Sequence, residues 1–216
     1  MHWIQIYILE QLLYVQTLRN RDMRPAKVES NLYQYHLKQL IKDGWIIKCD
    51  KVYTLAPKGL AWADRYSSEL RSARQQAKVI SVLIIENSVS EFLLITRERQ
   101  PFLGSLIIPS GKVKMGEPTS KAAQRELKEK TGLEEIALTM AGTARIITMS
   151  NEDVITDAVA FVWHGRATDH HVKQTSDGAT WIDFNNLSKR QTFPGSLELL
   201  DAFIRGQKHI EITMYI

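Results

Sequence analysis

The spacing of apolar residues changes near Lys78, and this change constrains the fold more than any other feature of the sequence. Before it, segments such as residues 31–44 carry apolar side chains at the three- and four-residue intervals of an amphipathic helix. After it come runs rich in Val and Ile, such as residues 79–86, which are typical of strands. The pattern predicts two domains, residues 1–76 and residues 77–216.

Residues 77–216 place predicted strands on both sides of a central helix. Strands are expected in VISVLIIE, EFLLITRE, SLIIPSG, two long runs joined near Asn151, TWIDF and HIEITMYI. A helix is predicted within residues 111–133, and SLELLDAFIRG predicts another that ends at Gly206. The polar run RATDHHVKQTSDG is expected to be a surface loop. Strands before and after a helix favour an α/β fold with a mixed sheet.

The first 75 residues predict the order helix, helix, hairpin, helix. Ser30 or Asn31 is expected to cap the second helix, and Gly44 is expected to end it. WIIKCDKVYTL predicts a hairpin around Asp50, and the next helix begins with Pro57, which the first turn of a helix tolerates. The polar segment SSELRSARQQ is the expected linker. The second helix is expected to bury Leu32, Leu37, Leu40, Ile41 and either Tyr35 or His36.

The net charge is concentrated in the first third of the chain. Residues 1–76 carry 12 Lys and Arg against 7 Asp and Glu, a net charge of +5, whereas residues 77–216 carry 16 against 17, a net charge of −1. A basic N-terminal part on a nearly neutral remainder favours an anionic partner. A solvated basic surface without a partner is the alternative.

Compartment and membrane association follow from what the sequence lacks. A single cysteine, Cys49, excludes an internal disulfide and a cysteine-rich zinc module, and the expected location is the cytoplasm. The apolar N-terminus has no basic n-region and is interrupted by Glu10, unlike a signal peptide. No run approaches the roughly 18 apolar residues of a membrane-spanning helix, so no membrane partner is expected.

The first third is similar to winged helix-turn-helix DNA-binding domains, through ESNLYQYHLKQLIKDGWI and YTLAPKGLAWAD. In that family the second helix of the pair enters the major groove and the hairpin contacts the backbone. The resemblance implies double-stranded DNA as a partner. The implied DNA-binding residues are Ser30, Asn31, Tyr33, Gln34 and Lys38 on the helix, and Lys48 and Lys51 on the hairpin. The alternative is a helical dimerisation or protein-docking module.

A homodimer is also expected, because winged-helix domains commonly pair to span two half-sites. The first helix supports this expectation, since its apolar side chains exceed what a short helix normally buries in so small a domain. These side chains are Trp3, Ile4, Tyr7, Ile8 and Leu12.

The stretch GKVKMGEPTSKAAQRELKEKTGL, residues 111–133, resembles the Nudix box, G-x5-E-x7-R-E-U-x-E-E-x-G-U with U aliphatic. Eight of its nine fixed positions match with unbroken spacing: Gly111, Glu117, Arg125, Glu126, Leu127, Glu129, Gly132 and Leu133. The resemblance implies a Nudix (MutT-like) hydrolase superfamily domain with the family's α/β/α sandwich. It also implies a structural role for Glu117, Arg125 and Gly132, with Glu117 paired to Arg125.

Glu126 and Glu129 lie three residues apart, on one face of a helix. Carboxylates grouped in this way can hold Mg²⁺, which prefers oxygen ligands and bridges diphosphates. The resemblance implies Glu126 and Glu129 as metal ligands and catalytic residues, with Gly111 at the metal. Glu152 and Asp153 are candidates for further ligands, although a polar hairpin tip is the more ordinary interpretation of that pair.

Lys130 departs from the box, because the pattern has a second glutamate at this position. A unit charge about 4 Å from another interacts by roughly 4 kcal/mol at an effective dielectric near 20, so Lys130 is expected to weaken Mg²⁺ binding. It could instead pair with Glu126, four residues earlier, or contact a diphosphate in place of the metal. Lys130 and Arg97 are therefore the predicted ligand-binding cations.

Two functions compete at this stage. The first is a ligand-responsive transcription regulator that binds a nucleoside-diphosphate-linked metabolite and couples it to DNA binding by the winged helix. The second is a Mg²⁺-dependent Nudix hydrolase of a nucleoside diphosphate derivative, whose N-terminal module serves dimerisation. Nudix-related regulators of NAD metabolism combine the same two domain types in the opposite order. Lys130 favours the first function, and the eight intact box positions favour the second.

Overall fold

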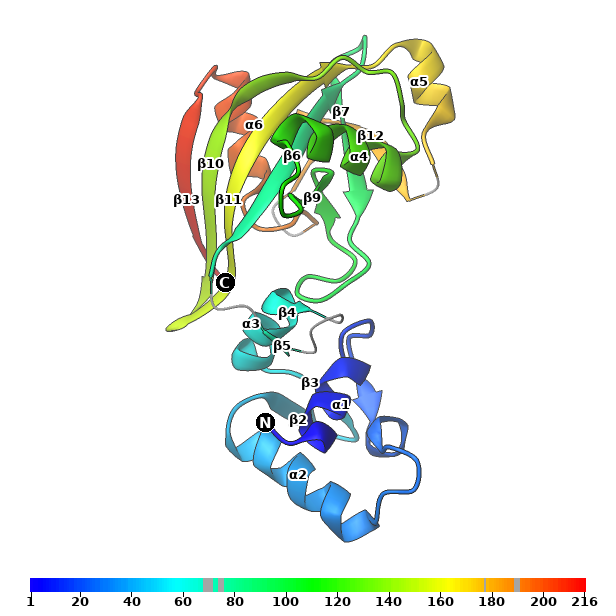
Figure 1. The fold of residues 1–216 in the computed structure, drawn as a ribbon, viewed down its shortest axis with the longest axis vertical. Helices are drawn as coiled ribbons and strands as arrows, with labels where there is room; N and C mark the ends of the chain where they lie inside the picture. Colours follow the sequence, from blue (N-terminus) through cyan, green and yellow to red (C-terminus); the bar gives the residue numbers. More distant parts are fainter. Residues whose placement is uncertain (68–71, 74–75, 177, 189–190) are drawn as a thin grey trace.

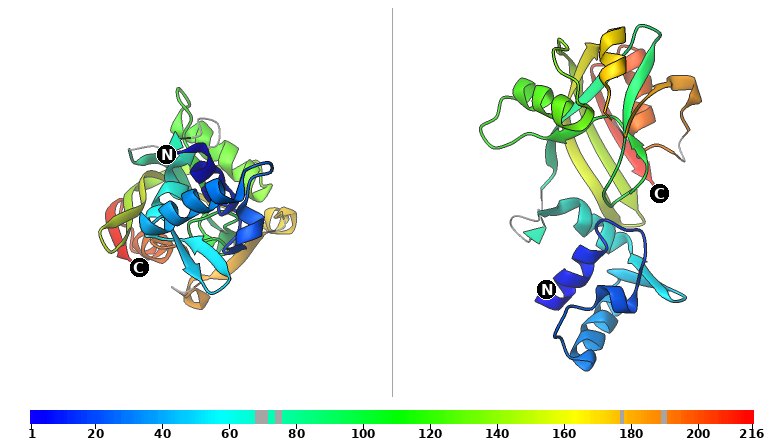
Figure 2. Two further views of the ribbon diagram at one scale, coloured as in Figure 1. Left: turned by 90° about the horizontal axis from the view of Figure 1, so that it is seen from below. Right: turned by 90° about the vertical axis from the view of Figure 1, so that its right-hand side faces the viewer.

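The computed structural model of the chain describes residues 1–67, 72–73, 76–176, 178–188 and 191–216. These residues form two lobes stacked along the long axis of the molecule, the smaller one N-terminal (Figures 1 and 2). The expected linker, residues 67–76, lies mostly outside the described residues. Its described parts belong to a small antiparallel pair of strands, β4 (Tyr66–Ser67) and β5 (Ser72–Ala73).

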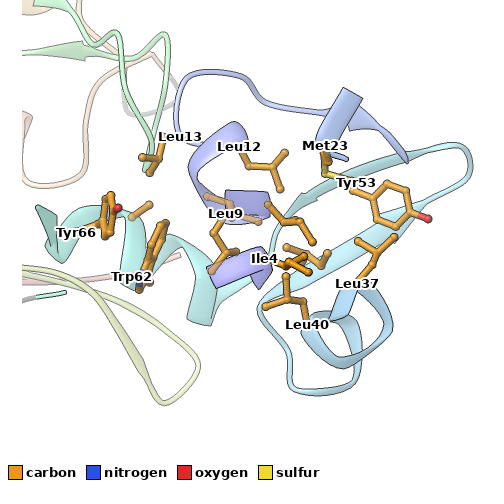
Figure 3. Packing of buried hydrophobic residues seen from close by; sticks show 14 of the residues in the cluster. Ile4, Leu9, Leu12, Leu13, Met23, Leu37, Leu40, Tyr53, Trp62 and Tyr66 are labelled. Atoms are coloured by element: carbon orange, nitrogen blue, oxygen red, sulfur yellow. The ribbon is translucent and has the colours of Figure 1, made fainter. Parts of the chain in front are cut away.

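The N-terminal lobe contains three helices, a 3₁₀ turn and a three-stranded sheet. In chain order these are α1 (Trp3–Gln11), β1 (Leu18–Arg19), η1 (Asn20–Met23), α2 (Ser30–Lys42), β2 (Ile46–Cys49), β3 (Val52–Leu55) and α3 (Pro57–Arg65). The sheet order is β1-β3-β2, with both neighbouring pairs antiparallel. Figure 3 shows the core, in which Ile4 and Leu9 of α1 meet Leu40 of α2 and Trp62 of α3.

Helix α2 differs from its expected form at its start and in the face that it buries. Glu29 is the N-cap, with no side-chain hydrogen bond, so neither Ser30 nor Asn31 caps the helix. Tyr33 is fully buried and its hydroxyl donates to the Asn20 carbonyl at 2.9 Å, while Leu32 is 46% exposed. The buried residues are Tyr33, His36, Leu37 and Leu40, which follow helical periodicity. The buried face therefore begins at Tyr33 and not, as the sequence predicted, at Leu32.

The apolar surface of α1 serves the lobe's own core. Ile4, Ile8 and Leu12 are all 0% exposed, and Tyr7 is half-buried. The expectation that this set is left over for a dimer contact is therefore wrong, because only Trp3, at 55% exposure, is fully accessible and Tyr7 is partly so.

The C-terminal lobe is an α/β sandwich built on one mixed sheet. Its elements are β6 (Lys78–Glu86), β7 (Glu91–Thr96), β8 (Leu106–Ile107), β9 (Ser110–Lys112), α4 (Thr119–Thr131), β10 (Thr139–Ser150), β11 (Asp153–Arg166), α5 (Asp169–Gln174), β12 (Ala179–Asp183), η2 (Phe184–Asn186), α6 (Ser196–Ile204) and β13 (His209–Tyr215). The strand order is β12-β7-β6-β11-β10-β13, with β8 beside β7 and β9 beside β6. Pairs β6–β11 and β10–β13 are parallel and the others antiparallel, which confirms the mixed sheet.

Helices α4 and α6 cover opposite faces of this sheet (Figure 1). Successive residues of β6 alternate between the two cores, as the pleat requires. Val82 and Ile84 pack in the cluster that contains Leu199 of α6, and Leu83 packs in the cluster that contains Leu127 of α4. The expected α/β fold with a mixed sheet is thus confirmed.

The run expected to be a surface loop contains the short helix α5 instead. Thr168 caps it, with His171 hydrogen-bonded back to the Thr168 backbone N–H, so local capping stabilises a turn that has no apolar periodicity. Among the described residues, no helix has the length and apolar character needed to cross a bilayer.

Candidate functional site

The site is built where β9 meets the middle of α4. β9 pairs antiparallel with β6, which places Gly111 opposite Ser81. Helix α4 follows a loop, buries Ala122, Ala123 and Leu127 against the sheet, and ends at Gly132, whose φ of 73° is the left-handed conformation common at helix ends. Its remaining face carries the charged residues of the box.

The carboxyl group of Glu126 lies against Gly111. A Cβ atom built on Gly111 would fall 1.8 Å from Glu126 Cδ, so only glycine leaves room for this side chain. Glu126 is 6% exposed, which is unusual for a carboxylate unless it is paired. The glycine of the box therefore makes space for a buried acid of the same box.

Arg125 connects the three glutamates of the site. Its Nε and Nη2 bind the two carboxylate oxygens of Glu117 at 2.8 Å each, a bidentate pair. Its Nη1 donates to Glu126 Oε1 at 2.5 Å and to Glu129 Oε2 at 3.3 Å, and Nη2 also donates to the Lys112 carbonyl at 3.0 Å. The ion pair between Arg125 and Glu117 that the box implies is present.

These contacts shift the ionisation of the network. Hydrogen bonds from Arg125, helped by the Lys114 backbone N–H, lower the pKa of Glu117 to about 2. Hydrogen bonds to Glu117 and Glu126 raise the pKa of Arg125 above its already high value. Glu117 and Arg125 are therefore both charged at neutral pH, and they fix the loop to the helix.

The predicted magnesium site lacks the donors that the ion needs. Both candidate carboxylates, Glu126 and Glu129, already contact the guanidinium of Arg125. Lys130 is exposed, and no ion pair with it is present among the described residues, so the alternative in which it pairs with Glu126 is not formed. The described part of the chain holds no cluster of three or more His, Cys, Asp or Glu side chains suited to a metal. Arg125 takes one oxygen of each carboxylate, which leaves Glu126 and Glu129 with one oxygen each for an ion that prefers octahedral oxygen coordination.

The two weaker ligand candidates lie elsewhere. Glu152 and Asp153 are exposed at the tip of the β10–β11 hairpin, where Arg65 of α3 donates to the Val154 carbonyl at 3.3 Å. Figure 1 shows this tip near α3, at the opposite end of the sheet from α4. They therefore cannot supply the missing donors, and the hairpin-tip interpretation is correct.

An apolar cavity lies on the α6 side of the sheet, next to β9. It has a volume of about 50 Å³ and is lined by Ile80, Val82, Ile107, Ile108, Ser110, Ile146, Phe193, Pro194, Gly195, Ser196 and Leu199. Ser110 is the chain neighbour of Gly111, so β9 links the cavity to the charged network. The sequence predicted none of these lining residues as functional, because QTFPG, which supplies Phe193, has no periodic pattern.

Arg97, a predicted ligand-binding cation, lies outside both features. Its Nε donates to the Pro101 carbonyl at 2.6 Å and its guanidinium lies 5.1 Å from the centre of the Phe193 ring. Burial lowers the pKa of Arg97, and the nearby charge of Asp64 opposes that shift. Arg97 therefore reaches the cavity only through Phe193.

The candidate DNA-binding residues differ in accessibility. Ser30, Asn31 and Lys38 on α2, and Lys48 and Lys51 on the β2–β3 hairpin, are exposed. Gln34 is half-buried and donates to Asn20 Oδ1 at 3.2 Å. Tyr33 is buried, and burial raises its pKa to about 12, so its prediction as an exposed contact is wrong.

Comparison with known proteins agrees with the geometry. An ADP-ribose pyrophosphatase of Methanocaldococcus jannaschii is 28% identical over 134 residues, covering 58% of this chain and 78% of that protein. The MutT protein of Methanosarcina mazei Go1 superposes with a TM-score of 0.50 at 20% identity, over 63% of this chain and 99% of that one. NrtR of Shewanella oneidensis gives a TM-score of 0.50 at 16% identity, over 59% and 61%.

The family model described as "NUDIX domain" matches residues 75–203, which is more than half of the chain. The matched range includes the network around Arg125, the cavity beside β9, and both covering helices. The chain belongs to the Nudix family.

Proposed function

We propose that this chain binds a nucleoside-diphosphate derivative in its Nudix domain and couples that binding to DNA binding by its N-terminal lobe. The observation that carries the proposal is the charge arrangement on α4. An exposed lysine, Lys130, stands where the box has a third carboxylate, while Arg125 holds Glu126 and Glu129. This arrangement favours an anionic ligand over a hard dication.

The charged rim and the apolar cavity lie on opposite faces of the sheet and are joined at β9, and each suits one part of such a ligand. The rim of α4 and its preceding loop carries the exposed cations Lys114 and Lys130, which suit a diphosphate. The cavity beside Ser110 is apolar and has an aromatic side chain, Phe193, in its wall, so it suits an apolar group of the ligand, and a base would have to displace Phe193 to enter. The name of the M. jannaschii relative supports ADP-ribose as the first ligand to test.

The N-terminal lobe supports a winged-helix interpretation by its topology. Helix α1, strand β1, the turn η1, helix α2 and the β2–β3 hairpin follow one another, and the sheet order is β1-β3-β2. On this proposal α2 enters the major groove with Asn31 and Lys38, and the hairpin places Lys48 and Lys51 near the backbone. The net charge of +5 over residues 1–76 favours the same partner. A homodimer would place two such helices on two half-sites.

The test is a pair of titrations on the full chain. Calorimetry should detect ADP-ribose binding with an affinity that changes little between Mg²⁺ and EDTA. Fluorescence anisotropy should detect binding to duplex DNA that weakens steeply with salt and changes when ADP-ribose is added. Rapid Mg²⁺-dependent hydrolysis of ADP-ribose, with no DNA binding at low salt, would overturn the proposal.

A second function remains supported by a specific observation. Glu117, Arg125, Glu126 and Glu129 are all in the places that the box requires, and the Glu117–Arg125 pair is intact. On this alternative the remaining oxygens of Glu126 and Glu129 would hold Mg²⁺, and water and the substrate would complete its coordination. The turnover measurement above separates the two functions.

A further inference from the structure

The connection between β7 and β8, residues 97–105, reaches from the sheet of the Nudix domain to the N-terminal lobe (Figure 1). Arg99 Nη2 donates to the Ala63 carbonyl at 2.8 Å and to the Tyr66 carbonyl at 3.1 Å, at the end of α3. The Gln100 backbone N–H donates to the Leu13 carbonyl at 3.0 Å. These hydrogen bonds join one connection to both the first and the last helical segments of the smaller lobe.

The same connection contacts the wall of the apolar cavity. The ring of Phe193, which lines the cavity, packs edge-on against Phe102 with centroids 5.2 Å apart, and Arg97 lies over it at 5.1 Å. A backbone hydrogen bond holds Phe193 to the strand directly after the connection, because Phe193 N–H donates to the carbonyl of Leu106, the first residue of β8, at 2.7 Å. Phe193 therefore has the cavity on one side and the 97–105 connection on the other.

The backbone of the connection is held in an unfavourable conformation at this contact. Phe102 has a φ of 65°, a region that bulky residues rarely adopt because it is strained for them. Contacts around the residue must offset this strain. The packing of Phe102 on Phe193 is one such contact, so a shift of the Phe193 ring would loosen the connection.

The junction beneath the connection contains buried charges that are only partly satisfied. Asp64 is 7% exposed and its Oδ1 accepts from Lys78, at the first residue of β6. Asp64 Oδ2 and Arg99 Nε are buried without a hydrogen-bond partner among the described residues. Unsatisfied buried groups raise the free energy of the folded state. A small rearrangement of the lobes that satisfies them would therefore cost little at this contact.

We infer that residues 97–105 couple occupancy of the cavity to the N-terminal lobe, with Phe193 as the side chain that senses the ligand. The inference names the regulation of the proposed site and in that respect rests on the proposed function. A ligand group that enters the cavity displaces or fixes the Phe193 ring. Phe102 and Arg97 then move with it, and the hydrogen bonds of Arg99 and Gln100 carry the change to α3 and to the end of α1.

Hydrogen exchange with mass spectrometry on the full chain tests this coupling first without any ligand. Phe193→Leu keeps an apolar side chain in the cavity but removes the ring contacts with Phe102 and Arg97. It should raise the amide exchange rate of peptides covering residues 10–16 and 57–66 by about threefold or more. This factor corresponds to the smallest interaction free energies found between residues in one contact network. Phe184→Leu, in η2 at the far end of β12, is the matched control and should leave these peptides unchanged.

A second arm uses ADP-ribose as the probe. In the wild type, saturating ADP-ribose should change exchange in the same N-terminal peptides. Arg99→Gln should retain ADP-ribose affinity within about twofold, because Arg99 touches neither cavity nor α4, yet lose that remote change. Arg166→Gln is the control and should behave as wild type. Arg166 is exposed at the end of β11 that lies away from the N-terminal lobe.

The two arms separate the coupling from the proposed function. Unchanged N-terminal exchange in Phe193→Leu, or a full remote response in Arg99→Gln, would overturn the coupling even if ADP-ribose binds. Absence of ADP-ribose binding to the wild type would count against the proposed function, and the ligand-free comparison of Phe193→Leu with Phe184→Leu would still decide whether the lobes are coupled.

Discussion

The carboxylate of Glu126 occupies the space that any side chain at position 111 would fill, because Gly111 has no Cβ. Gly111→Ala should therefore push Glu126 out of its contact with Arg125. Overpacking of this kind costs about 1–3 kcal/mol, so the midpoint of urea unfolding should fall measurably. ADP-ribose binding should weaken in the same variant.

A double-mutant cycle tests whether the steric contact is the cause. Glu126→Ala removes the carboxylate that an alanine at position 111 would meet. Adding Gly111→Ala to Glu126→Ala should then cost much less than adding it to the wild type. Equal costs in both backgrounds would show that the glycine serves the backbone instead.

Lys130→Glu distinguishes the two functions by the sign of its effect. If Lys130 contacts a diphosphate, the substitution should weaken ADP-ribose binding in EDTA by roughly tenfold, because a charge-assisted contact becomes a repulsion. If the protein is instead a hydrolase with a missing ligand, Mg²⁺ affinity and turnover should rise. Calorimetry with and without Mg²⁺ measures both, and Lys121→Glu, exposed on the same helix, is the control.

The pH dependence of stability should reveal the Glu117–Arg125 pair. The pKa of Glu117 is lowered from 4.5 to about 2, so the pair stabilises the fold above pH 4.5 and this contribution is lost as the pH falls toward 2. Urea unfolding should show wild type more stable than Glu117→Gln at pH 6. The difference should shrink between pH 4.5 and pH 2, and a difference independent of pH would contradict the pair's role.

Tyr33→Phe should affect stability and not DNA affinity. The substitution removes the buried hydrogen bond to the Asn20 carbonyl, with an expected loss of about 1 kcal/mol in the free energy of unfolding. Because the pKa of Tyr33 is raised to about 12, the folded state should also lose stability as the pH rises from 10 to 12, and this loss should be smaller in the variant.

Lys38→Ala should weaken DNA binding for all sequences alike. Lys38 is exposed on α2, and loss of one phosphate contact should reduce the salt dependence of binding by about one counterion. Anisotropy titrations at several salt concentrations measure this slope. Lys121→Ala, an exposed lysine in the Nudix domain, should have no effect, and an equal effect of both variants would indicate only general charge attraction.

The order of the elements could be predicted from the sequence, because runs of Val and Ile mark strands and apolar residues at three- and four-residue intervals mark helices. The buried face of α2 could not. Leu32 and Tyr33 could each face the core. Tyr33 is the one that does, because its hydroxyl donates a hydrogen bond to the Asn20 carbonyl in η1. Helix α5 was missed because it is stabilised by its cap and not by an apolar face.

The candidate site shows the same division. The spacing of the box predicts that Glu117, Arg125 and Glu126 are near one another, since helical periodicity and one loop bring them together. It does not predict that Arg125 contacts all three glutamates, nor that Phe193 and Ser110 line one cavity. Ser110 and Phe193 lie more than 80 residues apart in the chain, so no local pattern encodes their common cavity, and the contacts of Arg125 depend on how the loop before α4 folds back on the helix.

The long β10–β11 hairpin gives the two lobes a mechanical relationship. Its 14-residue second strand extends about 45 Å at the rise of an extended chain, and its tip lies against α3 through Arg65 and the Val154 carbonyl. A lever of this length converts a small change in sheet twist into a displacement several times larger at the tip. A small displacement of the sheet beside α4 would therefore become a larger displacement of the hairpin tip at α3.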